Sequence, residues 1–191
     1  NSIVYYSDID KAESFWMSYD QNLDDFTKQF LGENPSKDID KFVSRSKYST
    51  FYRYINKTDF IEIPHSLVDV LSDSVYGNKR RVLLSIIPQR KVNSFEIRTE
   101  DSFVFDNLTV QDVSLENENS KINISSGRIL TYITSNNDKK VIIDMVFDKK
   151  LNPKFNLIET SFDLMTNANF NFKPRSNVMM PMPFVTNDAI I

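Results

Sequence analysis

The sequence predicts one α+β domain in which a long N-terminal helix and a short helix pack on a curved antiparallel sheet. Three observations support this prediction. Apolar residues recur at helical spacing between residues 8 and 31, a second apolar run follows a proline at residue 64, and apolar and polar residues alternate over much of residues 81–164. Helical segments followed by a series of strands are typical of an α+β fold. The length of 191 residues suits one domain, alone or with a tail.

The long helix is predicted from Asp8 to Leu31. Ser7 or Asp8 supplies a capping oxygen at its start, and Gly32 ends it. The apolar positions are three or four residues apart, which places them on one stripe of a helix. That stripe either packs in the core or lines a ligand pocket between helix and sheet. Its residues are Ile9, Ala12, Trp16, Tyr19, Leu23, Phe26 and Phe30.

The other elements follow in order along the chain. A strand is predicted over residues 47–55, and a short helix from Pro64 to about Gly77, because proline suits the first helical position. The later strands are predicted over residues 81–87, 95–98, 103–116, 121–134, 139–147 and 155–164, with polar turns at 117–120 and 135–138.

Composition changes again near residue 167, where Asn, Pro and Met become frequent. We therefore predict a domain over residues 1–166 and an extended segment rich in Met, Pro and Phe over residues 167–191. The apolar side chains of this segment either dock back on the domain or serve as an interaction segment, and the sequence leaves both alternatives open.

The sequence offers few groups for catalysis. There is no cysteine, which excludes disulfides and thiolate metal sites, and three glycines are too few for a phosphate-binding loop. His65, the single histidine, follows Pro64 and suits a surface or capping role. Acidic pairs such as Asp24 with Asp25 lack a calcium-loop pattern. Hydrolysis by two carboxylates stays open because 26 acidic residues offer many pairs. We predict no catalytic, cofactor-binding or metal-binding residue and no enzymatic activity.

Charge and hydropathy indicate neither a nucleic-acid face nor a membrane span. The net charge is −3, and the main basic cluster, Lys79-Arg80-Arg81, leads directly into an apolar run. We interpret this cluster as a charged strand entry, with a phosphate contact as the alternative. No apolar stretch is long enough to cross a bilayer. We therefore expect no direct nucleic-acid partner and no membrane partner.

Several short motifs occur in a characteristic order: the Phe-Thr-x-x-Phe pattern at residues 26–30, the Ile-Pro helix start within residues 60–71, and the strand segments at residues 102–108, 126–130 and 146–148. In this order they resemble the LIM-domain-binding and SEUSS family of transcriptional co-regulators. The resemblance implies an NTF2-like dimerisation domain shaped as a cone. It also implies a nuclear scaffold without enzymatic activity or cofactor, and a composition rich in Asn, Lys, Asp and Ile suits a divergent yeast member that acts in filamentous growth.

The partners and interface also follow from this resemblance. The family implies a homodimer or a heteromeric assembly with transcription factors, either LisH-containing or otherwise DNA-binding, through the sheet and the C-terminal segment. The alternative is an NTF2-like small-molecule-binding protein or enzyme with a pocket between helix and sheet. The expected interface residues are Ile129, Tyr132, Ile143, Met145, Phe147, Met179, Met180, Met182 and Phe184.

Overall fold

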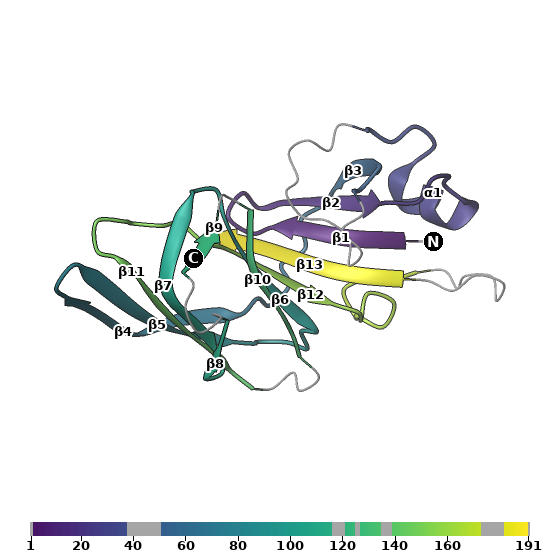
Figure 1. The fold of residues 1–191 in the computed structure, drawn as a ribbon. Coiled ribbons are helices and arrows are strands. Elements are labelled where there is room, and N and C mark those ends of the chain that lie inside the picture. Colours follow the sequence, from purple (N-terminus) through teal and green to yellow (C-terminus); the bar gives the residue numbers. More distant parts are fainter. Residues whose placement is uncertain are drawn as a thin grey trace. The chain divides into compact units, whose positions relative to one another are not determined.

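The protein is mostly β-structure, which corrects the α+β prediction. The computed structural model describes residues 2–37, 51–115, 121–124, 127–134, 139–172 and 182–190, without the side chains of 103 and 182–184. Strands account for 55 % of the described residues and the single helix among them for 5 %. The NTF2-like cone, with its long N-terminal helix, is therefore wrong (Figure 1).

The chain divides into two compact units. The first unit contains Asn1–Ile63 and Thr160–Ala189, and the second contains Pro64–Glu159 with Ile190–Ile191. The second unit is thus inserted, along the chain, between two segments that fold together. The predicted boundary between residues 166 and 167 stays a prediction.

The first unit is built on a sheet with the strand order β13-β1-β2-β3. Strand β1 runs parallel to β13 and antiparallel to β2, and β2 runs antiparallel to β3. Its elements are β1 (Ser2–Asp8), β2 (Glu13–Ser18), α1 (Asp25–Leu31), β3 (Tyr54–Thr58) and β13 (Met182–Ile190). Part of the predicted C-terminal segment therefore forms a strand that pairs with β1.

Strand β1, over which the sequence predicted no element, ends where the predicted long helix begins. Ile3 and Tyr5 pack in one apolar cluster and Val4 and Tyr6 in another, so both faces of the strand are buried. In the sequence, a strand that is buried on both faces is a continuous apolar run without alternation. The turn after it places Ala12 at a φ of 51°, in the left-handed region, which no continuous helix can contain.

Only the C-terminal part of the predicted long helix is helical. Asp24 caps α1 by accepting a 2.8 Å hydrogen bond from the Thr27 amide, and the Thr27 hydroxyl accepts one from the Asp24 amide at 3.0 Å. This reciprocal capping starts the helix at Asp25. Gly32, with a φ of 76°, ends it where the sequence predicted.

The second unit packs two groups of hydrogen-bonded strands around one core. One group has the order β4-β5-β11-β7-β8, with β9 also paired to β7, and the other has the order β10-β6-β12. Side chains from both groups, including Leu84, Phe95 and Ile143, meet in one buried cluster, as in a β-sandwich. The strands are β4 (Leu67–Tyr76), β5 (Lys79–Ile87), β6 (Ser94–Thr99), β7 (Phe103–Val110), β8 (Val113–Ser114), β9 (Ile122–Ile124), β10 (Gly127–Ile133), β11 (Val141–Asp148) and β12 (Asn156–Ser161, which continues into the first unit).

The predicted short helix after Pro64 is also wrong. Residues Leu67–Tyr76 form β4, which pairs with β5 through the two-residue turn Gly77-Asn78. Gly77 has a φ of 56°, a conformation that a tight hairpin turn requires and that glycine adopts readily. By contrast, the strands predicted from residue 81 onward agree in position with β5 to β12, but those predicted over 103–116 and 121–134 each divide into two, β7 with β8 and β9 with β10. The strand predicted over 47–55 overlaps β3 only at its end, and residues 47–50 lie outside the described residues, as do the turns predicted at 117–120 and 135–138.

Candidate functional site

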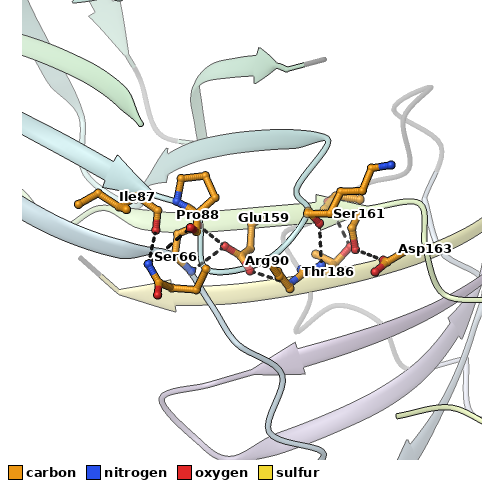
Figure 2. Close-up of polar contacts among 11 residues, drawn as sticks. Ser66, Ile87, Pro88, Arg90, Glu159, Ser161, Asp163 and Thr186 are labelled. Atoms are coloured by element: carbon orange, nitrogen blue, oxygen red, sulfur yellow. Dashed lines mark hydrogen bonds and ion pairs between the residues drawn. The ribbon is translucent and has the colours of Figure 1, made fainter. Parts of the chain in front are cut away.

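A buried polar cluster in the second unit is the first candidate site. Glu159 on β12 accepts hydrogen bonds from the Ser66 amide at 2.9 Å and from the Ser66 hydroxyl at 2.6 Å. Its other carboxylate oxygen accepts a 3.2 Å bond from Nε of Arg90, in the loop between β5 and β6. Figure 2 shows Ser66 and Arg90 on either side of the Glu159 carboxylate.

The chemistry of this cluster suits anchoring rather than catalysis. A hydroxyl beside a carboxylate has the composition of a nucleophile and a base, but a substrate must be able to reach them. The side chains of Arg90 and Glu159 are only 9 % and 3 % exposed, and the carboxylate is held by an opposite charge. Because Ser66 directly precedes β4, the cluster fixes the start of that strand to β12 in the other group of strands.

Polar contacts in the first unit are likewise structural. Ser161 donates a hydrogen bond to Asp163 (Figure 2). The hydroxyls of Thr160 and Thr186 lie 3.2 Å apart. On β1, the buried Tyr6 hydroxyl donates a 2.6 Å hydrogen bond to Asp188 on β13. Burial and the nearby Asp188 carboxylate raise the pKa of Tyr6 well above its ordinary value. Tyr6 therefore stays neutral and links the two parallel strands.

The basic cluster at the start of β5 is neutralised by carboxylates of the same unit. Arg80 forms an ion pair with Asp73 at 2.7 Å, and Arg81 forms one with Asp144 at 2.6 Å. Lys79 forms an ion pair with Asp106 on β7. This agrees with a charged strand entry and leaves the alternative, a phosphate contact, without support.

The second candidate site is the exposed β4–β5 hairpin. Five large apolar side chains of β4 are exposed: Leu67, Val70, Leu71, Val75 and Tyr76. Val70 and Val75 are each 61 % exposed, and Tyr76 is 52 % exposed. Isolated exposed apolar residues are ordinary, but a group on one strand marks an interaction surface.

Both sides of the hairpin contribute to this surface. Cross-strand partners point to the same side of a sheet, and Val70 is paired with the buried Leu84, so Val70 lies on the side that faces the core. Val75 is paired with Arg80, four residues before Leu84 on β5, and shares that side. Tyr76 is the next residue along and points to the opposite side. We call the exposed apolar side chains of β4 the β4 surface.

The predicted interface residues lie mostly elsewhere. Ile143, Met145 and Phe147 on β11 are buried in the core of the second unit, and Ile129 and Tyr132 on β10 are half-buried against it. Met179 and Met180 lie outside the described residues, and only the backbone of Met182 and Phe184 is described, in β13.

The structure does not gather the titratable residues that sequence analysis considered. His65 is exposed beside the buried Ser66, and Asp24 and Asp25 lie at the start of α1, where Asp24 is the N-cap. Within the described ranges, no group of three or more His, Cys, Asp or Glu residues could hold a metal ion. In the same part of the chain, no helix has the length and apolar character needed to span a membrane.

Comparison with known proteins gave no relative: neither the family models nor the curated proteins include a match to this chain. The site must therefore be judged from its own geometry. Sequence analysis missed the β4 surface because it interpreted residues 64–77 as a helix. A Gly-Asn pair between two apolar runs is a recognised hairpin signal, and Gly77-Asn78 could have revealed it.

Proposed function

We propose that this chain is a protein-interaction domain without catalytic activity and that it binds its partner through the β4 surface. The observation that carries the proposal is the exposure of Val70 and Val75 on the side of β4 that faces the core. Side chains on that side are normally covered, and here they stand at the edge of a sheet whose backbone can accept another strand.

The anchoring cluster supports this proposal. A binding surface is more effective when its strand is held in one conformation before the partner arrives. Ser66 and Glu159 fix the start of β4, and the ion pair between Asp73 and Arg80 links β4 to β5 near the turn. Both ends of the exposed strand are thus held within the second unit.

The transcriptional co-regulator role, with nuclear localisation and DNA-binding partners, stays a prediction from the motif resemblance. The cone that accompanied it is absent, so our proposal does not rest on that family. The alternative of a small-molecule site between helix and sheet required the long helix, which is absent as well.

The test compares partner capture by the full-length protein with capture by two variants. In Val70→Asp/Val75→Asp, two charges replace the exposed apolar side chains of β4. The matched control is Ile133→Asp, because Ile133 is 75 % exposed on β10 of the same unit. All three proteins should give the same circular dichroism spectrum, since exposed substitutions change stability little.

Quantitative mass spectrometry of the captured proteins then decides the question. We expect the double variant to lose specific partners by about tenfold or more, as when a central contact of an interface is removed, and the control to keep them. Equal recovery with all three proteins would exclude the β4 surface as the binding site.

A further inference from the structure

The outer edge of β4 presents an unusual length of backbone. The strand has ten residues and ends its group of strands. Among the described strands, β5 is the only one that pairs with it. An edge strand offers a row of N–H and C=O groups that another strand can bind.

A β-bulge limits which part of that edge is regular. The pairing with β5 shifts between Val70 and Ser72, so that Leu71 is an extra residue. Beyond the bulge, five consecutive residues pair without interruption, from Ser72 with Leu83 to Tyr76 with Lys79. A strand that adds to β4 would therefore pair best with Ser72–Tyr76.

Charge identifies a suitable occupant for this segment. The only charged residue in Ser72–Tyr76 is Asp73, which already forms hydrogen bonds with Nε and Nη2 of Arg80 at 2.9 and 2.7 Å. The segment thus needs no basic partner strand. Its other residues are two serines, a valine and a tyrosine, which are compatible with a second copy of the same segment.

We propose that β4 pairs with β4 of a second copy of this chain, antiparallel about a twofold axis through Ser74, forming one sheet continuous across both copies. This inference deepens the proposed function and rests on it, since it assigns an occupant to the same surface. An axis perpendicular to the sheet places one residue opposite its own copy, and Ser74 is the centre of the regular segment. Full overlap of the five residues therefore requires this register.

The same register avoids repulsion between like charges. With Ser74 opposite Ser74, Asp73 lies opposite Val75 of the other copy, and Ser72 lies opposite Tyr76. A shift of the axis to Asp73 would place two carboxylates directly opposite each other, which is destabilising. It would also bring the bulge at Leu71 into the pairing. The valine and tyrosine side chains that are exposed in one copy become partly covered in the dimer.

The absence of cysteine from the sequence makes a register-specific test possible. In Ser74→Cys, the two introduced thiols lie opposite each other, at the separation of about 4.5–5.5 Å between Cα atoms that a disulfide accepts. In the matched control Ser72→Cys, the two thiols are four residues apart along the strands, about 13 Å, which is too far. Both serines are exposed on the same strand.

We expect mild oxidation to link most of the Ser74→Cys protein into dimers on a non-reducing gel and to leave Ser72→Cys largely monomeric. Sedimentation of the unmodified protein over increasing concentration should show reversible dimers, since a contact of this size is weak. Val75→Asp should remove them, because the new carboxylate faces Asp73. Val75→Thr should keep them, because a neutral β-branched side chain then faces the same residue.

Equal linking of the two cysteine variants, or a monomer at every concentration with no linking of Ser74→Cys, would overturn the second copy as occupant. If the monomer nevertheless loses its captured partners in Val70→Asp/Val75→Asp, the proposed function stands and a different protein occupies β4. If that double variant also retains every partner, both proposals fail.

Discussion

Strands β3 and β4 both end a group of hydrogen-bonded strands, but they differ in how far other residues cover their outer backbone. The edge of β3 is short and partly covered within the first unit. Ser36 exchanges two backbone hydrogen bonds with Ile55, at 3.0 and 2.9 Å, and the Asn56 side chain donates to the Phe30 carbonyl. The edge of β4, in the second unit, is twice as long and has no such cover among the described residues.

The edge of β3 is therefore protected from the addition of another strand, whereas the edge of β4 is open to it. Proteins usually limit unwanted strand addition with short edges, charges, bulges or a covering loop. Strand β3 has a covering residue and the exposed Lys57, which pairs with Glu13 at 2.5 Å. Strand β4 has a bulge, yet five regular residues follow it and its apolar side chains remain exposed. Selective exposure of one edge is what strand-mediated binding requires.

The largest effect should come from releasing the anchored start of β4. Glu159→Ala leaves the buried Arg90 guanidinium without its carboxylate, so we expect the free energy of unfolding to fall by about 3–5 kcal/mol. Urea denaturation measures this loss, and hydrogen exchange should show a faster Ser66 amide. Glu159→Gln, which keeps an oxygen for Ser66, should lose less. A loss below about 1 kcal/mol for the alanine variant would refute the anchoring role.

A smaller effect should follow from uncovering β3. Ser36→Pro removes the N–H that bonds to the Ile55 carbonyl, so we expect a loss of about 1–3 kcal/mol in the free energy of unfolding. The Ile55 amide should also exchange faster with solvent. Ser36→Ala keeps the backbone bond and is the control. The comparison between the two edges fails if the proline variant and the alanine variant behave alike.

Alkaline pH should weaken the first unit through Tyr6. Because its pKa is raised in the folded protein, the folded state keeps a proton that the unfolded state loses above pH 10 or so. The stabilisation is complete below that pH and decreases as pH rises. Between pH 8 and about pH 11, the free energy of unfolding of the wild type should fall by about 1 kcal/mol more than that of Tyr6→Phe. Denaturation at the two pH values checks this, and parallel curves would contradict it.

Acidic pH should give the smallest effect, near the hairpin. Hydrogen bonds from Lys79 and Lys121 lower the pKa of Asp106, so its contribution is present at neutral pH and is lost as pH falls through the lowered value. The pairs are partly exposed, and we expect Asp106→Asn to cost less than about 1 kcal/mol at pH 7. The difference in the free energy of unfolding between Asp106→Asn and the wild type should become smaller below about pH 4. A constant difference would argue against the ion pairs as its cause.

Sequence analysis could predict the second half of the fold because its signals are local. Alternating residues and polar turns mark β5 to β12, and Gly32 marks the end of α1. The first half misled it because spacings of three and four joined residues from two different elements and from the loops beside them, among them Trp16 on β2 and Phe26 on α1. Burial of both faces of β1 removed the alternation that would have identified a strand.

The candidate site depended on information that no local pattern contains. Whether β4 is an edge is decided by which strands pair, and Ser66 meets Glu159 across 93 positions of sequence. The prediction of no catalytic residue rests on composition alone, requires no fold, and stays a prediction. The apolar run after Pro64 contains Leu67, Val68, Val70 and Leu71. A helix would have placed these side chains on one buried face. Strand β4 instead exposes three of them, Leu67, Val70 and Leu71.

The parallel pairing of β1 with β13 has a consequence for the order of folding. Ser2 pairs with Met182 and Asp8 with Asp188, so the first unit lacks one of its strands until the ribosome has added the residues of β13. The second unit, continuous from Pro64 to Glu159, contains nearly all of its strands before synthesis of β13 begins at Met182. The inserted unit can therefore fold first, while β1 waits with an unpaired edge that a chaperone or a neighbouring nascent chain could bind.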